Sequence, residues 1–136
     1  MSVRIDWFDE TKTIVFWQFS GRWNLNDLLT VYDEACQLCD TVPDRWVQAI
    51  VDMRDTSMMP NLISSSVATR ATRDPRNYDM AFVVTSSGFF QAIVNILNRL
   101  AGSKGKFQIA SSIEAAQEAI AERRKTLPPL SEMAEP

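Results

Sequence analysis

Three short apolar runs, separated by segments with helical spacing, constrain the fold of this chain more than any other feature. The runs span residues 46–53 (WVQAIVDM), 80–86 (MAFVVTS) and 106–111 (KFQIAS). The first two are of the continuous apolar type that is typical of buried strands. Strands that alternate with helices pair in parallel through right-handed crossovers. The sequence therefore predicts a parallel sheet with helices packed on one or both faces.

Two segments nearer the start favour an antiparallel hairpin. Residues 3–7 (VRIDW) alternate apolar and polar side chains, which is the period of a strand. Residues 13–19 (TIVFWQF) are β-branched or aromatic and apolar on both faces, so this strand is expected to be covered on both sides or to keep one face for a partner. The polar residues 9–12 (DETK) between them are typical of a turn.

Four further segments have the spacing and capping residues of helices. The expected helices span residues 24–40, 60–71, 87–101 and 111–125. The fold class is thus α/β, with a mixed, mostly parallel sheet and the order β-β-α-β-α-β-α-β-α. We expect one domain over residues 1–127, followed by a flexible tail over 128–136.

Composition excludes several classes of function. The net charge of −3 argues against a nucleic-acid partner, which needs a surplus of basic residues. No apolar run approaches the ~20 residues of a membrane span, and the first residues lack the apolar core of a signal peptide. Two cysteines without a secretion signal fit a reducing compartment. We therefore expect a cytoplasmic protein.

The inventory of catalytic side chains is poor. The sequence has no histidine, which removes the commonest general base, the common triads and most zinc sites. Cys36 and Cys39 have C-x-x-C spacing but lie near the end of an expected helix, where the dipole opposes a thiolate, so core packing is the better interpretation. We predict no catalytic residue, no metal site and no cofactor, and hence no enzyme.

Four stretches resemble one superfamily. They are GRWN (21–24), IVDMRD (50–55), FFQAIVNILNRL (89–100) and FQIASSIEAAQEAI (107–120). Together with the element order, they are similar to the STAS-like superfamily over about residues 3 to 125. That group contains bacterial anti-sigma-factor antagonists, transporter regulatory domains and, more distantly, CRAL-TRIO lipid carriers. The resemblance implies a STAS-like fold and a bacterial regulatory or protein-interaction module.

The loop after residues 50–55 departs from the antagonists' pattern. In those proteins the third strand ends in an aspartate, and the next helix begins Asp-Ser-Ser-Gly and is phosphorylated on a serine. Here Pro60 and Asn61 stand where Asp-Ser would be, and no glycine follows. The usual phosphoacceptor motif is therefore absent. From the residues alone, Asp55 or a hydroxyl residue after it caps the next helix, and Asp52 anchors the loop.

The same loop is the expected binding surface, because ligands and partners favour the carboxyl ends of parallel strands. We expect a protein partner there, and a homodimer stays open. The predicted contact residues are Asp52, Asp55, Ser57, Asn61 and Phe89.

An alternative is a small apolar-ligand or lipid-binding domain of CRAL-TRIO-like type. Its motivation is Met53, Met58 and Met59 around the loop, since methionine adapts to irregular apolar shapes. Trp17 and Phe19 would add an apolar patch if they faced away from the helices.

Overall fold

The computed structural model describes residues 3–23, 25–56, 75–88, 91–92, 95 and 107–130. The elements with described bounds are β1 (Val3–Trp7), β2 (Ile14–Gly21), α1 (Leu25–Asp40), β3 (Val47–Thr56), β4 (Tyr78–Val84), β5 (Phe107–Ala110) and α4 (Ile113–Arg124). They build one five-stranded sheet in the order β1-β2-β3-β4-β5. The pairing of β1 with β2 is antiparallel and the other pairings are parallel. The mixed, mostly parallel sheet predicted from the sequence is confirmed.

Two predicted helices fall mainly outside the described residues. The one expected over 60–71 lies there entirely. Of the one expected over 87–101, residues 88, 91, 92 and 95 are described and are helical. The amide of Gln91 donates to the carbonyl of Ser87 over 3.1 Å, so this helix begins next to Ser87, as the sequence predicts.

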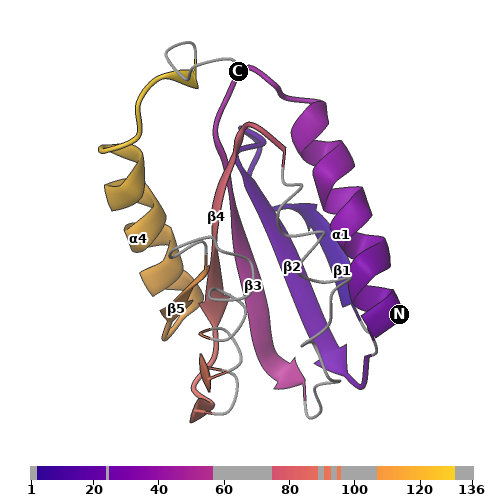
Figure 1. The fold of residues 1–136 in the computed structure, drawn as a ribbon. Coiled ribbons are helices and arrows are strands. Elements are labelled where there is room, and N and C mark those ends of the chain that lie inside the picture. Colours follow the sequence, from indigo (N-terminus) through magenta and orange to yellow (C-terminus); the bar gives the residue numbers. More distant parts are fainter. Residues whose placement is uncertain are drawn as a thin grey trace.

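The two fully bounded helices cover opposite faces of the sheet (Figure 1). On the α1 face, Val31, Ala35 and Cys39 of α1 pack in one cluster with every second residue of the strands, for example Trp17 and Phe19 of β2. On the α4 face, a second cluster joins residues of α4 to the other set of strand residues; its buried members are Ile14, Ile50, Met80, Phe82, Val84, Ala110, Ala116 and Ile120. The alternation of side chains along each strand therefore divides the core into two layers.

The aromatic residues of β2 belong to the α1 layer. Trp17 and Phe19 are buried and lie nearly parallel, with ring centroids 6.3 Å apart. Tyr32 of α1 meets Trp17 edge-on at 6.1 Å, and Trp23 meets Phe19 at 4.7 Å. These two side chains of β2 face α1, so the exposed apolar patch that they would have formed on the opposite face does not arise.

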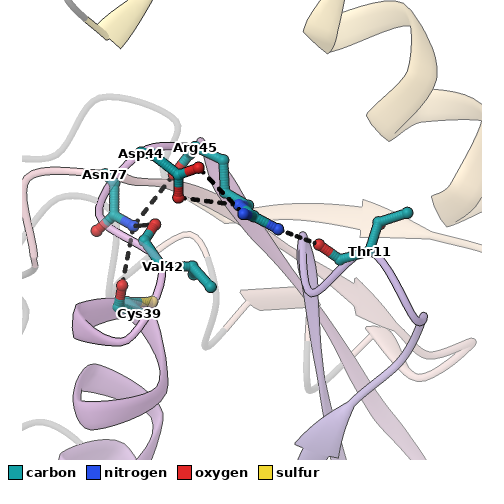
Figure 2. Close-up of polar contacts among 6 residues, drawn as sticks. All are labelled: Thr11, Cys39, Val42, Asp44, Arg45 and Asn77. Carbon is teal, nitrogen blue, oxygen red and sulfur yellow. Dashed lines mark hydrogen bonds and ion pairs between the residues drawn. The ribbon is translucent and has the colours of Figure 1, made fainter.

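We call the end of the sheet where β2–β5 begin the amino edge; its residues are Ile14, Val47, Tyr78 and Phe107. The buried Asn77, just before β4, ties the turn after α1 to this edge. The side-chain amide of Asn77 donates to the carbonyls of Cys39 and Val42 over 3.0 Å each, and to that of Arg45 over 3.1 Å (Figure 2). These bonds satisfy carbonyls at and beyond the end of α1, which have no partner inside the helix. Asn77 thus fixes the turn that leads from α1 into β3.

A second network fastens the last turn of α4 to the same edge. The guanidinium of Arg123 donates to both carboxylate oxygens of Asp79 over 2.9 and 3.0 Å, and Gln48 donates to one of them over 3.2 Å. Arg124 donates to the side-chain oxygen of Gln48 over 2.9 Å and to the carbonyl of Thr13 over 3.1 Å. Because the end of α4 is fixed at the amino edge, its first turn lies toward the opposite end of the sheet (Figure 1).

Candidate functional site

The candidate site lies at the carboxyl edge, which we define by the last residues of the parallel strands, Gly21, Thr56, Val84 and Ala110. Of the predicted contact residues, Asp52 and Asp55 lie on the last part of β3. Ser57, Asn61 and Phe89 lie outside the described residues, so their placement stays a prediction. The described part of this edge consists of the end of β3, the strand ends beside it and the start of α4.

Asp52 is the buried acid of this edge. Its side chain is 5% exposed, while that of Arg54 is 50% exposed. One carboxylate oxygen accepts the Arg54 amide over 3.1 Å and its Nε over 2.9 Å, and the other accepts Nη2 over 3.0 Å. The side-chain hydrogen bonds from Arg54 hold the pKa of Asp52 below its usual value, although burial acts in the opposite direction. Asp52 is therefore ionised at neutral pH and fixes the guanidinium with both oxygens.

A bulge in β3 decides which side chains of this edge reach the surface. Gln18 of β2 pairs with Asp52, but Ser20 pairs with Asp55, so β3 has one extra residue between them. In a regular strand, neighbouring side chains point to opposite faces. Here Arg54 and Asp55 are consecutive and both exposed. The bulge re-aims the end of the strand, and it thereby presents a cation and an anion side by side.

The neighbouring strand ends frame these two side chains. Trp23 donates its indole N–H to the hydroxyl of Thr56 over 2.9 Å, and that hydroxyl donates to the carbonyl of Gly21 over 2.8 Å. Gly21 has a φ of 60°, which favours glycine. These bonds fix the end of β3 against the end of β2, so the exposed pair stands on rigid backbone.

The start of α4 adds a further anion. Ser112 caps α4 by accepting the amide of Ala115 over 3.0 Å, and Glu114 lies in the first helical turn. Glu114 and Asp55 are both close enough to help raise the pKa of Arg54, after the larger effect of Asp52. Among the described residues, three carboxylates, those of Asp52, Asp55 and Glu114, therefore act on the guanidinium of Arg54.

Sequence reasoning singled out the two aspartates of this edge and missed Arg54. The sequence did contain the information for this ion pair. Residues two apart on a strand point to the same side, so the carboxylate of Asp52 and the guanidinium of Arg54 can bind each other. The bulge that exposes Asp55 beside Arg54 depends on the pairing of β3 with β2, which the local sequence of β3 does not encode.

The other candidate residues of the chain are buried or half-buried, or lie outside the described residues. Cys39 is buried in the core, as predicted, and burial together with the nearby Cys36 and Asp40 raises the pKa of its thiol to about 12. Met53 is buried as well, whereas Met58 and Met59 lie outside the described residues. Within the described ranges, no group of three or more possible metal ligands comes together. No helix of that same part of the chain is long and apolar enough to cross a membrane.

Comparison with known proteins identifies the fold. The structure is similar to that of an uncharacterized protein from the DUF3478 family with a SpoIIAA-like fold, from Shewanella loihica PV-4. The TM-score is 0.59, and the match covers 86% of this chain and 90% of that chain at 8% sequence identity. The chain therefore has a SpoIIAA-like, or STAS-like, fold, which confirms the resemblance seen in the sequence. No family model and no curated protein matches the sequence.

Proposed function

We propose that the protein is a non-catalytic, cytoplasmic regulatory module of bacterial STAS type that binds a protein partner through its carboxyl edge. The observation that supports this most is the exposed guanidinium of Arg54, held by both oxygens of the buried Asp52. Arginine is enriched at the energetic centres of protein interfaces. A side chain that is already fixed loses less conformational entropy when a partner binds.

The charges of the edge indicate the kind of partner. Asp55 and Glu114 are exposed and lie near Arg54, so the described side chains directly around the guanidinium carry more negative than positive charge. Complementary potentials speed association and fix the orientation of a complex. The partner surface should therefore be basic, with an acidic or carbonyl group placed to accept from Arg54.

The absence of the Asp-Ser-Ser-Gly pattern gives the module a further property. A phosphorylated serine adds a charge of roughly −1.5 to −2, which disrupts a packed or acidic interface. Because the usual phosphoacceptor does not stand at 60–61 in this sequence, partner binding should not depend on a serine kinase. Incubation with lysate and ATP, followed by mapping of residues 55–66, should find no modified serine.

Site-specific crosslinking tests the docking surface. A photoreactive residue is placed at position 55 in one variant and at position 10 in another, in the cells that make the protein. Both positions carry an exposed acid, but Glu10 lies in the turn between β1 and β2, near the amino edge. We expect one recurrent protein adduct at 55 that does not form at 10. Adducts of the same proteins at both positions, or none at 55, would contradict docking through the carboxyl edge.

Native mass spectrometry of the purified protein separates this function from the alternative of an apolar-ligand carrier. We expect the mass of the chain without an added small molecule. A co-purified apolar molecule in stoichiometric amount would favour the carrier instead.

A further inference from the structure

The segment after α4 makes specific contacts at the amino edge, opposite the proposed docking surface. The indole N–H of Trp46, just before β3, donates to the carbonyl of Pro128 over 2.7 Å. Arg76, just before β4, donates from Nη2 to the carbonyl of Leu130 over 3.0 Å. Figure 1 shows the segment that follows α4, in yellow, extending to the end of the sheet where β3 and β4 begin. Two side chains from separate loops thus bind two carbonyls of one short stretch.

The sequence of this stretch, Leu127-Pro-Pro-Leu130, favours an extended polyproline conformation. Each proline fixes its own φ near −65°, and each also pushes the residue before it toward extended backbone. In the structure, residues 127–129 lie outside helices and strands, and Leu130 is in a 3₁₀ turn. Both leucines are half-buried, whereas Pro128 and Pro129 are exposed. The segment therefore turns its two leucines toward the protein and its two prolines toward solvent.

The chemistry of the two donors matches a proline-rich ligand. Proline has no backbone N–H, so a Pro-Pro stretch offers carbonyl acceptors and few donors. The indole nitrogen of Trp46 and the guanidinium of Arg76 are donors only. Trp46 is half-buried, so part of its ring also offers apolar surface beside its donor. Aromatic grooves with such donors are a general way of recognising proline-rich segments.

We propose that Trp46 and Arg76 form a binding site for proline-rich extended peptides, and that residues 127–130 of this chain occupy it as an exchangeable internal ligand. The segment follows α4 directly, and α4 is fixed to the same edge through Arg123 and Asp79. A tethered ligand acts at an effective concentration in the millimolar range. An external proline-rich segment therefore competes poorly until the internal one is released.

The test uses the full chain and the peptide of residues 126–132 (TLPPLSE), blocked at both ends. The variant Leu127→Ser/Leu130→Ser removes the half-buried apolar face of the segment and leaves the site itself unchanged. Calorimetry should give a Kd for the peptide about tenfold lower for this variant than for the unaltered protein, because the internal competitor is weakened. Circular dichroism checks that each variant is folded.

A second substitution identifies the site. Trp46→Phe, added to the released variant, keeps an aromatic ring but removes the indole donor, and it should weaken peptide binding about fivefold, as expected for one neutral hydrogen bond. Trp7→Phe, at another half-buried tryptophan, should leave the Kd unchanged. Absence of peptide binding to the released variant, or equal binding with and without Trp46→Phe, would overturn the site. Equal affinity for the released and unaltered proteins would overturn the internal competition.

Discussion

Replacement of Asn77 by aspartate changes a buried donor into an acceptor with almost no change in shape. The amide nitrogen of Asn77 lies 3.0–3.1 Å from three carbonyl oxygens, and the residue is 5% exposed. In N77D, a carboxylate oxygen would face those carbonyls. The carbonyls would lose the Asn77 donor, although those of Cys39 and Val42 still accept the amides of Val42 and Arg45, and an unpaired charge would be buried. Each effect alone costs at least ~1 kcal/mol, and an uncompensated buried charge costs on the order of 3–5 kcal/mol. This is a large share of the ~5–15 kcal/mol that stabilises a typical domain.

The pH dependence of N77D distinguishes this mechanism from a general loss of packing. The new carboxyl group should have a folded-state pKa above the ~3.9 of the unfolded chain, because burial and the carbonyls disfavour its charge. Its penalty is therefore small below pH ~4 and grows as the pH rises through the folded-state pKa. N77A, which loses the donor without gaining a charge, should have a penalty of about 2 kcal/mol at every pH.

Urea unfolding, followed by tryptophan fluorescence between pH 3 and 7, measures both variants. A loss for N77D of less than about 1 kcal/mol at pH 7, or the same pH dependence for N77D and N77A, would refute the reasoning.

Three further predictions concern other contacts. Arg54→Met should lower stability at neutral pH by about 1–3 kcal/mol, because the buried Asp52 loses both side-chain donors and keeps only the backbone amide of residue 54. The pKa of Asp52 is depressed in the folded state, so this stabilisation is present above pH ~4 and is lost as the pH falls, which urea unfolding at pH 3 and 7 checks. With a thiol pKa of about 12, Cys39 in a Cys36→Ala variant should react with a thiol reagent at pH 8 only after unfolding. Arg123→Ala should lower the free energy of unfolding by about 1–3 kcal/mol in the same assay. The reason is that the carboxylate of Asp79, whose side chain is 5% exposed, loses two hydrogen bonds.

The sequence predicts the strands because their apolar patterns are local. The hairpin and the parallel strands follow from alternation and apolar runs, and both are present. A serine cap of α4 is also present, but it is Ser112 and not Ser111, which the sequence favoured because Glu114 follows three residues later. The resemblance to STAS-like proteins predicted the fold, and the comparison of structures confirms it. Alternation divides the apolar residues of β2 between two faces, but whether a helix covers the face of Trp17 and Phe19 was left open, because both faces are apolar.

The details of the edges were not predictable in this way. The extra residues in β3 and β4 appear only when the strands are paired, since a bulge is a property of the register between neighbours. The contacts of Trp46 with Pro128 and of Arg76 with Leu130 join positions far apart in the chain. The sequence suggested a flexible tail from residue 128, and the structure shows that its first residues accept hydrogen bonds. The bounds of the domain stay a prediction.

The affinity of the crosslinked partner for charge-reversed variants tests the central proposal most directly. Asp55→Lys and Glu10→Lys change the net charge equally, at exposed positions near opposite edges of the sheet. Titration calorimetry at physiological salt should show that Asp55→Lys weakens binding at least about tenfold, or ~1.4 kcal/mol, and that Glu10→Lys leaves it within about twofold. Equal weakening by both substitutions, or no change with Asp55→Lys, would contradict docking at the carboxyl edge.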